Sequence, residues 1–116
     1  MYISKTIRVR NFPISGETKH LFITIVYDGS KIHKVFLHIG KGSTQDIADF
    51  ESVTRLVNLH LSAGGKVEDI VCALQNIDSG IRFHYENRAA KSLSDLLAVI
   101  LRQEINEIRE EFYDAT

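Results

Sequence analysis

The chain has 116 residues, of which 44% are hydrophobic and 25% charged, and its formal net charge at pH 7 is −1. This balance is typical of one compact globular unit, so we predict a single domain over residues 1–116. The near-zero charge argues against a general binder of DNA or RNA, which usually carries an overall basic excess. A lone cysteine, Cys72, excludes an internal disulfide. With no apolar run that could span a bilayer and no leader, these features predict a soluble cytoplasmic protein with no membrane partner.

The first forty residues predict an antiparallel β-meander of three strands. Residues 2–10 alternate apolar and polar side chains, which suits a strand with one solvated face. Residues 11–20 contain the only proline and a glycine, and they predict an irregular connection. Residues 21–28 and 31–40 are rich in β-branched and aromatic side chains and flank the short turn at Asp28 and Gly29, which predicts a hairpin.

A long amphipathic helix is expected next. The glycines at residues 40–42 mark a turn, and Ser43 with Asp46 resembles a capping box, so the helix should begin at Ser43 or Thr44 and end near Ala63. Its apolar side chains recur every three or four residues and form one broad face that we expect to lie on the sheet. They are Ile47, Phe50, Val53, Leu56, Val57 and Leu61.

The remaining chain predicts a shorter helix over residues 67–74, a short strand over 81–85, a loop and a long final helix. Ser92 and Asp95 resemble a second capping box, from which the final helix should run to about Tyr113. Its apolar residues follow a nearly heptad spacing, so the helix either covers the sheet or pairs with the same helix of another subunit. We therefore expect an α+β fold and a homo-oligomer. The seam comprises Leu93, Leu97, Leu101, Ile105, Ile108 and Phe112.

Four stretches of the sequence resemble a known family: RVRNFPISGETKH from Arg8, Gly40-Lys41-Gly42, RLVNLHLSAGG from Arg55 and VEDIVCALQNI from Val67. Together they are similar to the small domain named for its Thr-Ser-Cys-Pro-Asp motif (TSCPD), found at the C-terminus of cobalamin-dependent ribonucleotide reductases and as free-standing proteins. The resemblance implies the fold of that domain. The family carries cysteines, thought to hold a metal, where this chain has residues 78–80 and 91–95, which lack cysteine. We therefore expect no metal and no cofactor.

The segment RFHYENR is the main candidate for a ligand site. Phe83 or Tyr85 would stack on a base, Asn87 would read its edge, and Arg88 would neutralise a phosphate. The alternative is an edge strand in which Phe83 and Tyr85 are buried and the other side chains are solvated.

The final helix adds a polar stripe, because Arg102, Asn106, Arg109 and Tyr113 follow at steps of four, three and four. Neither Arg102 nor Arg109 has an acidic residue three or four positions away, although the helix is rich in glutamate. Their partner should therefore lie outside the helix, as either a ligand phosphate or an acid across a subunit interface.

A second possible anion site is the start of the first helix, where Lys41, Ser43 and Thr44 stand beside free backbone N–H groups. The alternative there is a well-capped helix and nothing more.

No catalytic constellation stands out, so we predict that the protein is not an enzyme. The five histidines form no HxxxH or HExxH pattern, and residues 40–43 lack the glycine spacing of a P-loop. One hypothesis is a nucleotide-binding protein, because the chain loosely resembles the phage sponges that disarm the Thoeris defence by sequestering cyclic ADP-ribose isomers in the host cytoplasm. The other is an accessory or protein-interaction domain of nucleotide metabolism, akin to the reductase tail.

Overall fold

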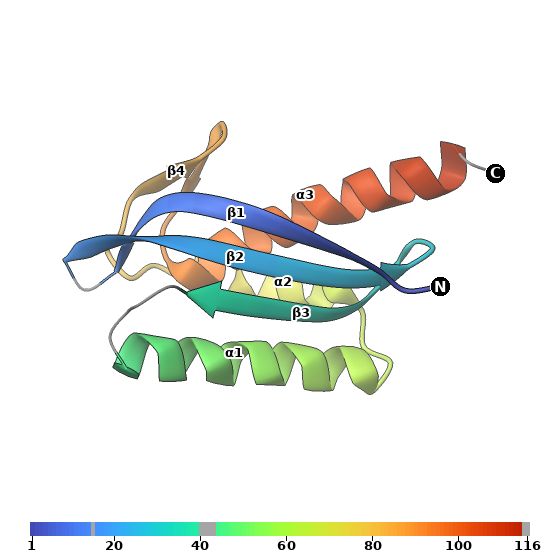
Figure 1. Ribbon diagram of the computed structural model, residues 1–116, viewed down its shortest axis with the longest axis horizontal. Coiled ribbons are helices and arrows are strands. Elements are labelled where there is room, and N and C mark those ends of the chain that lie inside the picture. The colour runs from blue at the N-terminus through green and yellow to red at the C-terminus, as the bar shows by residue number, and fades with distance from the viewer. Residues whose placement is uncertain (15, 40–43, 115–116) are drawn as a thin grey trace.

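The computed structural model describes residues 1–14, 16–39 and 44–114, and it has the expected α+β fold. The strands β1, β2 and β3 form one antiparallel sheet in that order, and β4 pairs with β5 in a separate hairpin (Figure 1). Across the described residues, no helix is long and apolar enough to cross a membrane. The elements are β1 (Ile3–Ile14), β2 (Glu17–Asp28), β3 (Lys31–Ile39), α1 (Thr44–Ser62), α2 (Val67–Leu74), β4 (Phe83–Tyr85), β5 (Arg88–Ala90) and α3 (Leu93–Asp114).

The first two strands are longer than predicted, because residues 11–14 and 17–20 extend them instead of forming an irregular connection. The register slips between Val9 and Phe12, where Asn11 takes a φ of 58°, as in a β-bulge. Pro13 is tolerated beyond the bulge because β1 is an edge strand, whose outward N–H groups need no partner strand. The predicted hairpin at Asp28 and Gly29 is confirmed.

The core lies between one face of the sheet and the final helix. Leu21, Ile23 and Ile25 of β2 are fully buried, and so are Leu97 and Leu101 of α3. Figure 1 shows α2 and α3 on the far side of the sheet from the viewer. Of the two arrangements predicted for the final helix, the structure shows the one in which it covers the sheet. Leu97, Leu101, Ile105 and Ile108 of the apolar seam are buried within the chain, while Phe112 is 39% exposed.

The long helix α1 lies along the outer edge of β3, and the expectation that it covers a face of the sheet is wrong (Figure 1). The Asn58 side chain hydrogen-bonds with the backbone of Val35, while Val57 and Leu61 reach the core. Leu56, predicted to lie on the buried face, is 66% exposed. Because α1 packs on the edge of the sheet, its contact with the sheet is narrower than its apolar stripe. Leu56 lies outside that contact and is therefore exposed.

The segment predicted as a loop after residue 85 instead contains a strand, since Arg88–Ala90 pairs with Phe83–Tyr85 across a two-residue turn. Glu86 occupies this turn with a φ of 53°, and its carboxylate accepts a hydrogen bond from Gln103 of α3 at 2.9 Å. This contact ties the tip of the hairpin to the final helix.

Candidate functional site

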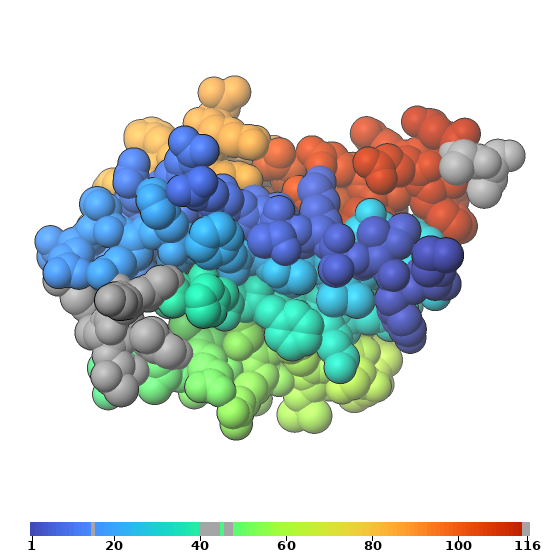
Figure 2. All heavy atoms as spheres, viewed as in Figure 1, coloured from blue at the N-terminus to red at the C-terminus, as the bar shows by residue number. Residues whose placement is uncertain are grey.

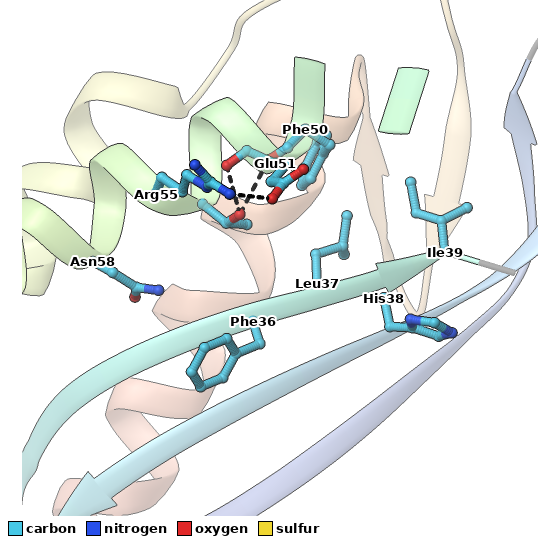
Figure 3. Close-up of a pocket in the computed structure, with 9 residues that line it drawn as sticks. Phe36, Leu37, His38, Ile39, Phe50, Glu51, Arg55 and Asn58 are labelled. Atoms are coloured by element: carbon cyan, nitrogen blue, oxygen red, sulfur yellow. Dashed lines mark hydrogen bonds and ion pairs between the residues drawn. The ribbon is translucent and has the colours of Figure 1, made fainter. Parts of the chain in front are cut away.

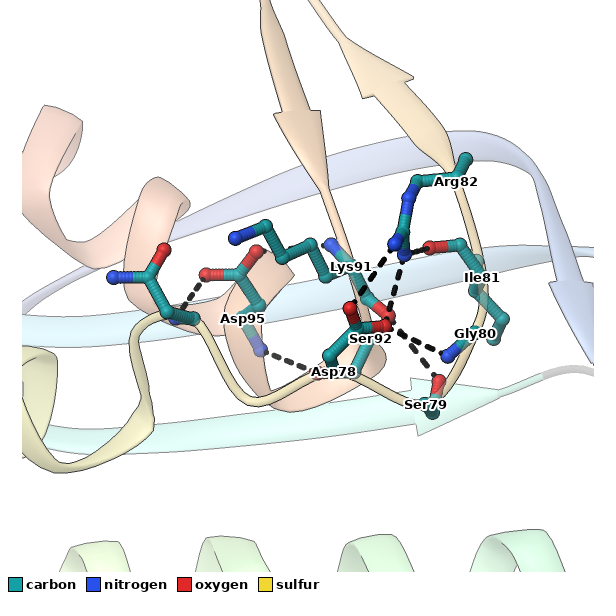
Figure 4. A network of polar contacts seen from close by, with 9 residues as sticks. Asp78, Ser79, Gly80, Ile81, Arg82, Lys91, Ser92 and Asp95 are labelled. Atoms are coloured by element: carbon teal, nitrogen blue, oxygen red, sulfur yellow. Dashed lines mark hydrogen bonds and ion pairs between the residues drawn. The ribbon is translucent and has the colours of Figure 1, made fainter.

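The two segments that replace the family's cysteine positions lie side by side (Figure 4). The backbone N–H of Ser79 donates to the carbonyl oxygen of Lys91 at 3.1 Å, and the Ser79 hydroxyl donates to the same oxygen at 3.3 Å. Residues 78–80 and 91–95 are therefore joined by hydrogen bonds, which hold the start of the β4–β5 hairpin against the start of α3.

Asp95 is the buried centre of this junction, with 4% of its surface exposed. Its Oδ1 accepts the backbone N–H of Asn76 at 2.7 Å, and its Oδ2 accepts the backbone N–H of Lys91 at 2.9 Å. The N–H of Asp95 itself donates to the Ser92 hydroxyl at 3.0 Å, so Ser92 caps α3 as predicted. Only half of the expected capping box forms, because the Asp95 carboxylate binds two loops instead of returning to the Ser92 backbone.

Asp78 anchors the exposed side of the junction. Its two carboxylate oxygens accept hydrogen bonds from the Arg82 guanidinium at 2.8 and 3.0 Å, and Oδ1 also accepts the Gly80 N–H at 2.8 Å. The Arg82 guanidinium, and secondarily the Gly80 N–H, lowers the pKa of Asp78 to about 2. This carboxylate is therefore charged at any ordinary pH.

The chemistry of this junction does not fit the metal of the family. The ligands that remain are carboxylates whose oxygens already accept hydrogen bonds, and no thiolate stands at either segment. In the part of the chain that the structure describes, no three His, Cys, Asp or Glu side chains are grouped to hold an ion. The contacts that join the two segments here are hydrogen bonds.

Two of the predicted ligand residues, Arg88 of β5 and Arg102 of α3, line one small cleft of about 150 Å³. Arg102 donates to the Gln75 side-chain oxygen at 2.5 Å, and Arg88 is exposed. Among the described residues, neither arginine forms an ion pair with a carboxylate. The other residues that line the cleft are Gln75, Asn76, Ala89, Asp95, Ala98 and Val99.

Arg109 has its partner outside its own helix, as predicted, but the partner belongs to the same chain. Its guanidinium lies 2.7 Å from the Glu68 carboxylate of α2, and both side chains are partly exposed. Glu68 of α2 and Gln75, the residue that follows α2, are seven residues apart, as are Arg102 and Arg109 on α3. The two helices therefore run antiparallel and are joined by two polar contacts, one near each end of α2.

Phe83 and Tyr85 are half-buried and pack against the core, as the edge-strand alternative predicts. The Phe83 ring meets the Phe12 ring edge-on, with 5.1 Å between their centroids. Burial raises the pKa of Tyr85. Asn87 is exposed at the tip of the hairpin, next to Arg88. Of the six ligand residues predicted in RFHYENR and α3, the structure thus brings Arg88 and Arg102 to one cleft, while Asn87 precedes Arg88 in the turn of the hairpin.

The secondary site predicted at the start of the first helix falls mostly outside the described residues. Lys41 and Ser43 precede the described part of α1, and Thr44 is its first residue.

Sequence reasoning missed a larger cleft of about 510 Å³ between β3 and α1 (Figure 3). Phe36 and His38 line it from β3, and Arg55 lines it from α1, where it forms an ion pair with Glu51 at 2.6 Å. The alternation of residues 31–40 placed Phe36 and His38 on one face of a strand, but nothing local to the sequence placed Arg55 at the same cleft.

Comparison with protein families identifies the chain. The family model of the TSCPD domain matches residues 3–105, and the chain belongs to this family. Comparison with curated proteins gives no match, and neither does comparison with solved structures.

Proposed function

We propose that this TSCPD domain is a non-catalytic nucleotide-binding module in which Arg88 and Arg102 hold the phosphate groups. The observation that supports this role is the approach of two guanidinium groups, from β5 and from α3, to one cleft without a carboxylate ion pair among the described residues. Asp95 also lines the cleft, but both of its oxygens accept backbone N–H groups. The arginines thus retain donors for an anion.

The size of the cleft limits what it can hold. Ligand pockets for whole small molecules usually measure about 300–1,000 Å³, and this cleft measures about 150 Å³. It suits a phosphate or part of a pyrophosphate, while the nucleoside would extend over the outer surface of the β4–β5 hairpin. The exposed Asn87 lies there next to Arg88 and supplies an amide for a base edge.

We further propose that the ligand is a signalling nucleotide of the cyclic ADP-ribose type. The protein would sequester it in the host cytoplasm, as the phage anti-Thoeris sponges do. A pyrophosphate suits two arginines that line one cleft. Among the residues that the structure describes, no nucleophile and base are arranged to cleave it. The alternative function is an accessory or protein-interaction domain of nucleotide metabolism, which membership of the TSCPD family favours.

A ligand screen by thermal shift separates the two functions. A nucleotide at a hundred times its Kd adds about 2.7 kcal/mol to the free energy of unfolding. The screen covers mononucleotides, dinucleotides, ADP-ribose and its cyclic isomers, and the bound ligand should be recovered unchanged after heating. Absence of a shift with every nucleotide rules out the nucleotide-binding function.

Variants of the two arginines then locate the site. Arg88→Ala or Arg102→Ala should weaken binding about ten- to a hundredfold, because each removes a charge-assisted hydrogen bond to the phosphate. Arg82→Ala is the matched control, since Arg82 is an exposed arginine whose guanidinium binds Asp78 instead. Equal affinity for all three variants would place the nucleotide elsewhere.

A homo-oligomer remains part of the proposal, but a different surface supports it. Leu56 and Leu59 of α1 are 66% and 64% exposed. Leu56 also lines an apolar groove of about 390 Å³ between α1 and α2. Large exposed leucines next to an apolar groove are typical of a surface that a second copy would cover.

A further inference from the structure

Among the described elements, no helix covers one face of the three-stranded sheet, which we call the open face. Figure 2 shows its side chains at the surface between α1 and α3. The opposite face packs on α3, so the residues of the open face alternate along each strand with buried ones. The strand register places them in three rows across the sheet. The rows are Arg8, Phe22 and His38; Thr6, Thr24 and Phe36; and Ser4, Val26 and Lys34.

Aromatic and basic groups lie together on this open face. The Arg8 guanidinium carbon lies 6.0 Å from the centroid of the Phe22 ring, within cation–π range, and the Phe22 and His38 rings are 6.5 Å apart. Phe36, in the next row, is 48% exposed. A phenylalanine half-exposed in the middle of a sheet face offers a flat ring on which another ring can stack.

The charge of the open face is positive, although that of the chain is −1. Arg8 and Lys34 stand in the rows, Arg10 is exposed further along β1, and Lys31 lies at the far end of β3. The described strands contain two acids, both at the ends of β2: Asp28, 3.5 Å from the N-terminal ammonium, and Glu17, 2.9 Å from Lys19. In the β3–α1 cleft, Glu51 neutralises Arg55. Many of the remaining acids lie on α3, which packs on the other face of the sheet; they include Glu104, Glu107, Glu110, Glu111 and Asp114.

The open face continues into a cleft at each end of β3. One is the β3–α1 cleft, which Phe36 and His38 line from β3 and Arg55 lines from α1. The other, of about 500 Å³, is lined by Tyr2, His33, Lys31 and Lys34, and the Tyr2 and His33 rings are 4.9 Å apart. From His33 to His38 the strand rises about 3.3 Å per residue, which gives a track of about 17 Å.

We propose that the open face binds a single-stranded nucleic acid. Unpaired bases would stack on Phe36 and Phe22, while Arg8 and Lys34 neutralise the phosphates, the combination by which single strands are held without sequence readout. A duplex hides its base faces and would gain only the phosphate contacts. A second copy placed symmetrically would bring Arg8 and Lys34 near their own copies, which is unfavourable. This proposal replaces the expectation of no nucleic-acid partner. That expectation was based on the net charge of the whole chain, which does not reveal that basic residues are concentrated on one face.

The test is fluorescence anisotropy of fluorescein-labelled 12-mers, dT12 and rU12, titrated with the protein at several salt concentrations. We expect saturable binding that weakens with salt, since each neutralised phosphate contributes about −0.7 to the slope of log K against log salt. Phe36→Ala should weaken binding about 5- to 150-fold without unfolding the exposed site, and Phe36→Tyr should restore it. Lys34→Gln should reduce the slope by about 0.7.

Matched controls separate this face from other surfaces. Leu56→Ala removes an exposed apolar side chain from α1, Arg82→Gln removes a cation from outside the face, and neither should change the affinity. Arg88→Ala with Arg102→Ala should also leave strand binding intact, so failure of this proposal is distinct from failure of the nucleotide cleft.

Three results would overturn the proposal. The first is no saturable binding of either 12-mer by folded protein at 50 mM salt or below, a concentration at which electrostatic binding is strong. The second is equal affinity for duplex and single strand with no effect of Phe36→Ala. The third is a dimer that Phe36→Ala converts to monomer, which would make the face a self-interface.

Discussion

Asn58 of α1 pairs with the backbone of Val35 in β3 as another strand would. Its Oδ1 accepts the Val35 N–H at 2.8 Å, and its Nδ2 donates to the Val35 carbonyl at 3.0 Å. An edge strand with unpaired N–H and C=O groups invites pairing with another chain. One amide side chain therefore blocks the middle of this edge and fixes α1 against the sheet.

Replacing Asn58 by Leu should lower the free energy of unfolding by about 1–3 kcal/mol, because it leaves two part-buried backbone groups without partners. Urea denaturation measures the change. Asn106→Leu, at an exposed position of α3, is the control and should fall within about 0.5 kcal/mol of the parent. Equal losses for the two variants would mean that the Asn58 pairing adds nothing.

Lys5 of β1 forms ion pairs with α3, and 42% of its side chain is exposed. Its Nζ lies 2.8 Å from Glu104 and 3.2 Å from Glu107, and the Glu104 side chain is only 7% exposed. Lys5→Met should cost about 1–3 kcal/mol, because it leaves a buried carboxylate unpaired. The double variant Lys5→Met with Glu104→Leu should recover most of this loss. A double variant as unstable as the sum of the single ones would show that the two residues are not coupled.

The Asp78–Arg82 pair predicts a pH dependence. An unfolded aspartate has a pKa of about 3.9, and the folded value for Asp78 is about 2. A lowered folded pKa gives stability that is present above the unfolded value and lost as pH falls through the folded one. The stability difference between the parent and Arg82→Gln should therefore be constant above about pH 5 and shrink toward pH 2. A difference that persists unchanged at pH 2 would exclude this pair as its source.

Because Asp95 joins two loops by hydrogen bonds, we expect mutation of Asp95 to lower the stability of the protein and treatment with a chelator to leave it unchanged. Dialysis against a chelator should leave the melting temperature unchanged, since hydrogen bonds join the two segments that correspond to the cysteine positions of the family. Asp95→Ala should lower the free energy of unfolding by about 2–4 kcal/mol, because the Asn76 and Lys91 N–H groups lose their acceptor. Glu110→Ala, at an exposed position of α3, is the control. Stoichiometric metal in elemental analysis of dialysed protein would contradict this prediction.

Self-association should depend on α1 and not on α3. We expect light scattering to show an oligomer that Leu56→Glu with Leu59→Glu dissociates, because both side chains are exposed on the folded chain. Leu101→Glu would instead unfold the protein, since Leu101 is fully buried. If light scattering shows that the unmodified protein is a monomer at micromolar concentration, the proposal that it forms a homo-oligomer is wrong.

The sequence predicted those parts of the fold in which local signals agree with tertiary contacts. The Asp28–Gly29 hairpin, the helix over residues 67–74 and the Ser92 cap are of this kind. The prediction that α1 covers a face of the sheet was wrong. Both long helices carry an apolar stripe, and the periodicity of a stripe does not reveal which surface it packs against. Pro13 suggested that the first strand ends before it, but β1 is an edge strand, in which a proline is tolerated.

The candidate site was predictable only in part, for a similar reason. Arg88 was singled out by its residue type within RFHYENR, and Arg102 by the lack of an acidic residue three or four positions away on its helix. The partner of Arg109 is Glu68, 41 residues earlier in the chain, and no local rule reveals it. The grouping of Arg8, Phe22 and His38 depends on the register of three strands, which alternation within one strand does not fix.

The position of α3 over the sheet has a consequence for synthesis on the ribosome. The three strands are translated first, and the helix that covers Leu21, Ile23 and Ile25 follows more than fifty residues after β3. At about 5–20 residues per second, the apolar face of the nascent sheet waits about 3–12 s for Leu101 to be added. Chaperones that hold nascent chains should therefore bind this protein between the synthesis of β3 and of α3, and slow codons in that interval should promote its aggregation.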